Sequence, residues 1–318
     1  MKSYREIKES LKEGLKGVFK LVTGLSALCC AGGCGGEEGG EWIFVCGEDR
    51  VLALDPAASG GEQADRVWEW QVSDLASQIP ESYLGYLPPV NDCKPVDGNR
   101  KILITGGAAV VMLDRETKEC LFYAHTPNAH SAEWLPGNRV AVALSVAEGG
   151  NSLRMYDAGH PDRVLSEDSL YSGHGVVWLP ERKLLYALGF DELRAYSPEK
   201  GEGAQTAWQA ERVWKLPEDG GHDLVRLSKD GLLVTASRGV YRFDLAQERF
   251  TPFEPLQDVP EVKSVYYDEA SGHLVYTRAE ESWWTHHIYL RRPDRTLTLP
   301  HLRLYKARVM KFKDSITH

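Results

Sequence analysis

The stretch HSAEWLPGNRVAVA (residues 130–143) decides the fold, because the chain contains two further copies of it. These copies are HGVVWLPERKLLYA (174–187) and HDLVRLSKDGLLVT (222–235). Each begins with a histidine, continues as a short apolar strand, makes a polar turn and enters a second apolar strand. Self-similarity with a period of about 43 residues is the sequence signature of a repeat architecture.

Two weaker copies flank the three strong ones, beginning at NDCKPV (91–96) and KSVYYD (263–268). A third strand then follows in each repeat, as in AVVMLD (109–114), and a fourth, as in RVWKL (212–216). Four short strands per period, with no helical pattern between them, are typical of a β-propeller blade. We therefore predict an all-β propeller with four-stranded blades.

The two ends of the propeller sequence are predicted to share one blade. WIFVCG (42–47), RVLALD (50–55) and RVWEW (66–70) supply three of its strands, and YKARVMKF (305–312) supplies the innermost. This pairing closes the ring and removes exposed strand edges. The count is six blades, because residues 74–89 are too few for a seventh. We predict one six-bladed propeller domain over residues 41–318.

Residues 1–40 have a different character. Lysines and arginine precede an apolar stretch, residues 21–31, which is shorter than the about 20 residues that span a bilayer. Cys29 and Cys30 lie at the end of this stretch and Cys34 follows it, in a pattern similar to a bacterial lipoprotein box. We expect an export signal and lipoprotein leader with a flexible tether, and the alternative is an amphipathic helical tail. The protein would then lie at the outer membrane, facing the periplasm or the cell surface, with its lipid anchor as the sole membrane contact.

The composition is that of a globular protein, with 42% hydrophobic residues and a formal net charge of −9. A nucleic-acid partner is not expected, because phosphate binding requires a basic face. Cys46, Cys93 and Cys120 are too few and too widely spaced for a disulfide framework or a cysteine metal site, and at most one pair could close. We expect a monomer.

The candidate site follows from aligning the repeats. The innermost strands of a propeller run side by side along the channel, so the residues at their starts converge on the axis. The aligned residues are Asn91 or Asp92, His130, His174, His222, Lys263 and Lys306. A histidine at the same position of three consecutive repeats favours a ligand-binding site over solvated channel residues. Polar neighbours that could assist are Ser131, Glu133, Ser172, Asp223, Glu261 and Ser264.

Two kinds of chemistry fit these residues. Neutral His130, His174 and His222 could coordinate a divalent metal, with Asp92 or a water molecule completing the site, although the two lysines would repel an ion at the centre. Alternatively, the histidines and lysines could receive a carboxylate or sulfate, with one of them acting as a base on an acidic sugar. Both chemistries remain open at the level of the sequence.

Tryptophans provide the other candidate contacts. Trp134 and Trp178 recur at equivalent positions and are expected in the core between blades. Trp283 and Trp284 follow an acidic turn, and they could either stack on sugar rings or pack in the outer strands. We favour packing for this pair.

The histidine-led segments at residues 130–136, 173–180 and 220–224 resemble those of an uncharacterised family of exported six-bladed propeller lipoproteins of glycan-degrading Gram-negative bacteria. The resemblance covers nearly all of residues 41–318, and it implies a six-bladed propeller fold and an exported location rather than an activity. A weaker likeness is to propeller polysaccharide lyases such as oligogalacturonate lyase, which implies metal-ligand roles for His130, His174 and His222. The chain departs from the lyases in having six blades rather than seven and no matching fourth ligand.

The expected function is a cell-envelope propeller that binds a saccharide or another small anionic ligand at the axial site, with or without a divalent metal. One alternative is a lyase or hydrolase of acidic glycans that uses an axial His or Lys as its base. The other alternative is a protein-interaction scaffold that uses the blade faces.

Overall fold

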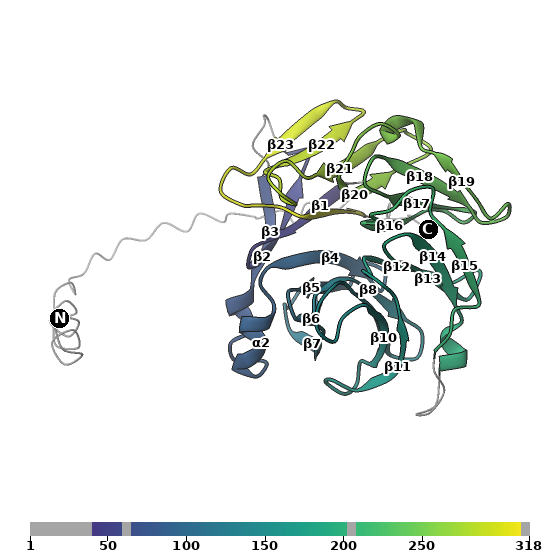
Figure 1. Ribbon diagram of the computed structural model, residues 1–318. Helices are drawn as coiled ribbons and strands as arrows, with labels where there is room; N and C mark the ends of the chain where they lie inside the picture. Colours follow the sequence, from purple (N-terminus) through teal and green to yellow (C-terminus); the bar gives the residue numbers. More distant parts are fainter. Residues whose placement is uncertain (1–39, 59–64, 202–207, 313–318) are drawn as a thin grey trace, which may run out of the picture. The chain divides into compact units, whose positions relative to one another are not determined.

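The computed structural model describes residues 40–58, 65–201 and 208–312, and it contains six four-stranded antiparallel sheets (Figure 1). The predicted six-bladed propeller with four-stranded blades is confirmed. Cys29, Cys30 and Cys34, with the rest of the predicted leader, lie outside the described residues. No helix in the described ranges is long and apolar enough to cross a membrane.

Each blade is one sheet, and its four strands follow one another from the channel outward. Blade 1 contains β24 (Lys306–Lys311), β1 (Glu41–Gly47), β2 (Arg50–Asp55) and β3 (Asp65–Gln71). Blade 2 contains β4 (Val90–Val96), β5 (Lys101–Gly106), β6 (Ala109–Asp114) and β7 (Cys120–His125). Blade 3 contains β8 (Ala129–Leu135), β9 (Arg139–Leu144), β10 (Ser152–Asp157) and β11 (Val164–Ser169).

The remaining blades have the same arrangement. Blade 4 contains β12 (Gly175–Leu179), β13 (Leu184–Leu188), β14 (Glu192–Tyr196) and β15 (Arg212–Lys215). Blade 5 contains β16 (Asp223–Ser228), β17 (Gly231–Thr235), β18 (Val240–Asp244) and β19 (Arg249–Pro252). Blade 6 contains β20 (Val262–Tyr267), β21 (Leu274–Arg278), β22 (His287–Arg291) and β23 (Arg295–Thr298). Short helical turns occur at η1 (Val72–Leu75), α2 (Glu81–Tyr86), η2 (Pro198–Gly201) and η3 (Glu254–Leu256).

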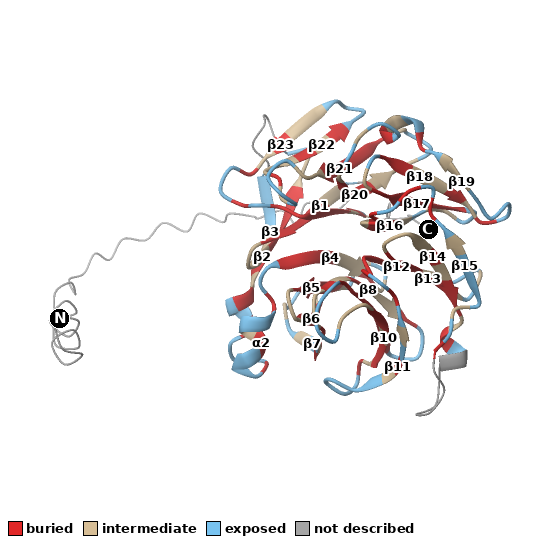
Figure 2. Cartoon of the chain, in the orientation of Figure 1, coloured by how far each residue is buried: buried red, intermediate tan, exposed pale blue. Residues whose placement is uncertain are grey.

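The core lies between the blades. The second strand of blade 3, β9, is buried at every position, whereas the outermost strand of blade 4, β15, is mostly exposed. Figure 2 shows the same contrast between β4, which is mostly buried, and α2, which is mostly exposed. Central strands are covered on both faces by neighbouring blades, so they are continuous apolar runs rather than alternating ones. Between β8 and β9 the chain reverses at Gly137 and Asn138, which both have positive φ, as a tight hairpin turn requires.

Strand β24 closes the ring as predicted, because it pairs antiparallel with β1 without a register shift. The register sets Val309 opposite Ile43 and Ala307 opposite Val45. Ala307 and Val309 pack in the hydrophobic cluster between blades 1 and 6. Alternation along the strand therefore turns Lys306 and Arg308 to the other side, toward the channel.

Candidate functional site

A cavity of about 350 Å³ lies at the mouth of the channel, where the innermost strands begin. Its lining residues are Pro89, Asn91, Gly107, Asn128, His130, His174, His222, Lys263, Trp283, Trp284 and Tyr305. Five of the predicted site residues are therefore brought together at the mouth: Asn91, His130, His174, His222 and Lys263. Asp92 and Lys306 do not line the cavity.

β-bulges turn three of these side chains toward the axis. Asn91, His130 and Lys263 are each the extra residue at a register shift near the start of β4, β8 and β20. A bulge re-aims a side chain that regular pleating would direct elsewhere. His174 and His222 instead directly precede β12 and β16, so they take the equivalent position without a bulge.

The three imidazoles form a row across blades 3, 4 and 5. The ring centroids of His130 and His174 are 4.2 Å apart, and those of His174 and His222 are 5.3 Å apart. Tyr305 adds a fourth ring, 5.6 Å from His130. The row occupies one side of the cavity, and its members come from consecutive copies of the repeat.

In blades 3 to 6, the residue two positions before each axial side chain has a left-handed backbone conformation, with positive φ. Asn128, Ser172, Gly220 and Glu261 have φ values of 50°, 51°, 74° and 59°. Three of these residues also form a hydrogen bond with the axial side chain two positions later.

The amide oxygen of Asn128 accepts a 3.1 Å hydrogen bond from His130 Nε2, and the carbonyl of Ser172 accepts one of 2.8 Å from His174 Nδ1. Glu261 binds Lys263 Nζ at 2.8 Å. His222 follows a glycine and therefore has no such partner.

Lys263 replaces that missing partner. Its ammonium group donates to His222 Nε2 at 2.8 Å, so His222 carries its proton on Nδ1. His222 Nδ1 and His130 Nδ1 are buried and have no hydrogen-bond partner in the part of the chain that the structure describes. Buried polar atoms of this kind are normally completed by water or a ligand.

The imidazoles are uncharged at neutral pH. Burial, and then the positive charge of Lys263, lowers the pKa of His222 to about 2. Burial also lowers the pKa of His174 to about 4, and it holds that of His130 well below its usual range, with His174 adding to the effect. Burial lowers the pKa of Lys263 as well, although Glu261 opposes the shift. The cavity wall therefore contains polar groups but carries little net charge.

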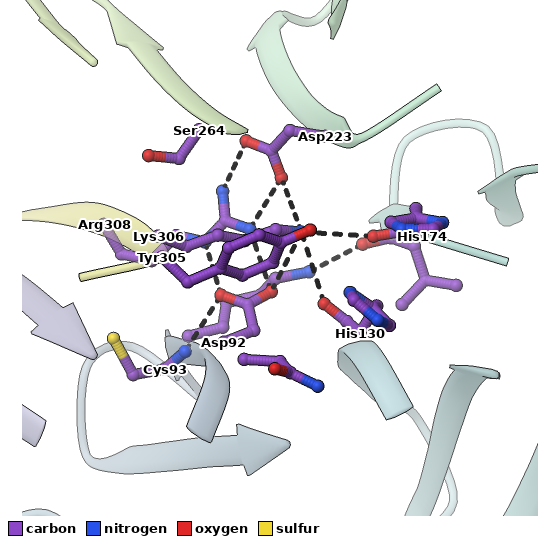
Figure 3. Close-up of polar contacts among 12 residues, drawn as sticks. Asp92, Cys93, His130, His174, Asp223, Ser264, Tyr305, Lys306 and Arg308 are labelled. Atoms are coloured by element: carbon purple, nitrogen blue, oxygen red, sulfur yellow. Dashed lines mark hydrogen bonds and ion pairs between the residues drawn. The ribbon is translucent and has the colours of Figure 1, made fainter. Parts of the chain in front are cut away.

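A buried ion network forms the floor beneath the cavity (Figure 3). Lys306 Nζ lies 3.2 Å from Asp223 Oδ1 and donates to the main-chain carbonyls of His130 at 3.2 Å and His174 at 3.1 Å. Its side chain has no exposed surface. Lys306 thus reaches from β24 to the far side of the channel.

Arg308 completes this network with two paired contacts. Its guanidinium group binds both carboxylate oxygens of Asp92 at 2.8 Å and those of Asp223 at 2.7 and 2.8 Å. Burial opposes ionisation of the two acids, but Arg308 and Lys306 outweigh it and hold both carboxyl pKa values below their usual range. Two cations and two anions therefore compensate one another. The sequence alignment predicts Asp92 and Lys306 as ligand contacts, whereas the structure places both in the floor.

The loop between β21 and β22 adds two indoles to the rim of the cavity. Trp283 is 62% exposed, so the favoured prediction that it packs in the outer strands is wrong. Trp284 is half-buried, with its ring 5.7 Å from that of Tyr305 and 5.9 Å from the guanidinium carbon of Arg303. For Trp283 the alternative prediction, a loop that displays aromatic side chains, is therefore the correct one.

The expectation that Trp134 and Trp178 pack between blades is confirmed, although both side chains are only half-buried. Trp178 is only half-buried and lines a second cavity, of about 330 Å³, at the opposite end of the innermost strands. Trp134 is half-buried and packs against the cluster between blades 2 and 3, with Lys101 Nζ 4.2 Å from its ring centroid. Both indoles therefore contribute to the inter-blade core, and Trp178 packs against the cluster between blades 3 and 4.

The polar neighbours predicted to assist are divided between four places. Ser172 and Glu261 hold axial residues at the cavity, and Asp223 belongs to the floor. Ser131 and Ser264 are buried, and Ser264 bonds Thr277 and the Ala307 amide. Glu133 pairs with Lys94 at 3.4 Å beside the second cavity.

Metal ligation is not evident in the described ranges. No group of three or more His, Cys, Asp or Glu side chains there is arranged to hold an ion. His130 Nε2, His174 Nδ1 and His222 Nε2 are instead used in hydrogen bonds to neighbouring residues. Cys46, Cys93 and Cys120 are free thiols.

Comparison with known proteins assigns a family. Residues 56–316 match the model of a family of unknown function (DUF6528), and the chain belongs to this family. No curated protein matches the sequence.

Solved structures show the same fold. A chain in the crystal structure of a nidogen/laminin complex superposes with a TM-score of 0.57 at 14% identity, covering 85% of this chain and 98% of that one. A chain in the crystal structure of a mitotic checkpoint complex superposes with a TM-score of 0.53 at 10% identity, covering 90% of this chain and 89% of that one. At these identities the similarity extends to the fold alone.

Proposed function

We propose that this member of the family binds a saccharide in the axial cavity. The observation that carries the proposal is an exposed indole, Trp283, at the rim of a cavity whose wall contains three uncharged imidazoles and the amide of Asn91. Sugar rings present an apolar face that stacks on an aromatic side chain and an edge of hydroxyl groups that needs hydrogen-bond partners. His174 uses Nδ1 for Ser172, which leaves Nε2 as an acceptor for a sugar hydroxyl.

The charge balance favours a saccharide over a small free anion. Lys263 is compensated by Glu261 at 2.8 Å, and Lys306 and Arg308 are compensated by Asp92 and Asp223. An anion entering the cavity would meet no uncompensated cation among the described lining residues. A desolvated anion without a paired charge is costly to bury, whereas hydroxyl groups need only hydrogen bonds.

The test is a binding screen on immobilised polysaccharides and oligosaccharides. Trp283→Ala should weaken binding about tenfold or more, because aromatic contacts contribute about 0.5–1.5 kcal/mol beyond the area they bury. Val213→Ala, a change at an exposed apolar position on β15, is the control and should bind like the wild type. Absence of binding to every glycan would refute the proposal and favour the scaffold alternative.

A lyase or hydrolase is the second candidate, and Lys263 is the residue that favours it. Burial lowers the pKa of its ammonium group, and that group contacts His222, so the pair could accept and relay a proton. Incubation with acidic oligosaccharides, followed by product analysis, separates turnover from binding. A role for a metal is tested in the same assay with chelator-treated protein to which zinc, manganese or calcium is returned.

Location at the cell envelope is part of the proposal. Its support is the sequence of residues 21–40, with cysteines at the end of an apolar stretch and just after it. Metabolic labelling with a fatty acid, in the wild type and in Cys29→Ser, Cys30→Ser and Cys34→Ser variants, would identify the acylated cysteine. Unlabelled wild-type protein in the soluble fraction would contradict a lipid anchor.

A further inference from the structure

The axial cavity is closed at its floor. The six innermost strands contact one another around the channel in the order β24, β4, β8, β12, β16 and β20, so β12 lies opposite β24. Lys306 of β24 spans this width, since its Nζ donates to the carbonyl of His174, the residue before β12. Deeper in the channel, Lys94 Nζ from β4 donates to Val176 O on β12 at 2.6 Å. Two lysines thus cross the channel at successive levels.

The floor separates two cavities. The mouth cavity and the second cavity at the other end have no lining residue in common. Between them lie Lys306, Asp92 and Asp223, whose side chains are 0–1% exposed. These groups are fixed by charge-assisted hydrogen bonds, which are the strong ones in a buried setting. A polymer therefore cannot thread from the mouth to the far end.

We infer that the cavity recognises the terminal residue of a saccharide chain rather than an internal segment. This inference rests on the proposed function. A blind cavity of about 350 Å³ is at the small end of ligand sites and has room for about one or two sugar rings. An internal residue would need two exits for the chain, and the floor removes one of them.

The lining assigns an orientation to the chain. The polar groups, His130, His174 and Lys263, lie at the starts of the innermost strands, close to the floor. Trp283 and Pro89 are the exposed residues of the lining, and they mark the rim. The end residue directs its hydroxyl groups to the imidazoles, and the next residue leaves across the Trp283 indole.

The experiment counts chain ends. The polysaccharide with the strongest signal in the binding screen is compared, at equal mass, before and after partial cleavage by an endo-acting glycosidase. Binding sites per gram should rise in proportion to the number of chains. Its purified oligosaccharides should reach full affinity per molecule at two or three residues and gain nothing from further length.

Failure of this inference can be distinguished from failure of the proposed function. Sites per gram that stay constant after cleavage, or affinity that keeps rising with length, would show internal binding and overturn this inference while leaving saccharide binding intact. Failure of every glycan to bind would remove the proposed function and this inference with it. Trp283→Ala should lose about tenfold in affinity for a trisaccharide and less for a monosaccharide, because the single residue does not reach the rim.

Discussion

The ammonium nitrogen of Lys306 lies 3.2 Å from a carboxylate oxygen of Asp223, and neither side chain has exposed surface. The pair joins β24 to β16, across 83 positions of sequence. A buried charge without its partner is strongly unfavourable, so each residue depends on the other. The strand that closes the ring is thus coupled to the residues that close the channel.

Asp223→Asn should therefore be strongly destabilising. The amide keeps the shape of the carboxylate but leaves Lys306 and Arg308 with Asp92 as their only carboxylate partner among the described residues. Loss of one member of a buried pair costs about 3–5 kcal/mol, and urea unfolding at pH 7 measures it. Glu181→Gln is the control, because its contact with Arg226 is exposed, and its unfolding curve should stay close to that of the wild type. Equal curves for the two variants would contradict a structural role of the network.

Stability should fall as the pH is lowered from about 7 to 5. The pKa values of His130, His174 and His222 are held below that of an unfolded histidine, about 6.5. In this range the unfolded chain binds protons that the folded chain does not, so acid favours unfolding by up to roughly 1.4 kcal/mol per pH unit for each imidazole. Asp92 and Asp223 act later, since carboxyl groups with lowered pKa lose their stabilising contribution only below about pH 4.

Urea unfolding at several pH values measures this slope, and His222→Asn should flatten it. His273 contributes to the pH dependence of stability in the opposite direction, because its hydrogen bond to Glu41 raises its pKa. Because His273 is present in both the wild type and His222→Asn, its contribution to the slope cancels when the two proteins are compared. A slope that is identical in the wild type and His222→Asn would show that His222 has the same pKa in the folded and unfolded chains, which contradicts the lowered value.

The repeat made the fold predictable, because each strand and turn of a blade depends on residues close together in the sequence. It also placed His130, His174, His222 and Lys263 correctly around one mouth. The alignment could not distinguish Asn91 from Asp92, since a bulge at Asn91 moves the register by one residue. A bulge depends on pairing with the next strand and leaves no clear pattern in the residues themselves.

Lys306 shows a second limit of the sequence. It aligns with the histidines, but β24 has no bulge at this position, and the side chain enters the buried network. The alignment does not identify Arg308, although its spacing of two residues from Lys306 along a strand is a usable signal. Packing is the wrong prediction for Trp283 because exposure depends on the path of its loop, which local sequence does not determine.

Glu280 should fix the loop that carries the indoles. Its carboxylate binds the Thr285 and Tyr289 hydroxyls and His287 Nδ1. Partial burial opposes ionisation, but these hydrogen bonds outweigh it and lower the pKa of Glu280 to about 2. Glu280→Gln should accelerate amide hydrogen exchange at Thr285 and His287, since an amide cannot accept all three bonds.

Glu281→Gln is the matched control for this loop, because the neighbouring Glu281 contacts Trp284 through its main chain. Exchange in the control should match the wild type. If Glu280→Gln and Glu281→Gln exchange alike, the loop is held by its main-chain contacts and not by the Glu280 side chain. The wild-type, Glu280→Gln and Glu281→Gln proteins should then also bind glycans equally.

Gly106→Ala should disturb the fold and the cavity together. A Cβ atom at Gly106, the last residue of β5, would lie 1.8 Å from the main-chain oxygen of Leu87 and 3.1 Å from that of Pro89. Main-chain atoms cannot rotate away, so the segment that contributes Pro89 to the cavity wall must shift, at a cost of about 1–3 kcal/mol.

Gly85→Ala is the matched control, because nothing lies within 4 Å of its Cβ position and alanine favours the helix α2 that contains it. Thermal unfolding should show a lower midpoint for Gly106→Ala and an unchanged or higher one for Gly85→Ala. Equal midpoints would mean that the Leu87–Pro89 segment yields freely, and glycan binding by Gly106→Ala should then be weakened without loss of stability.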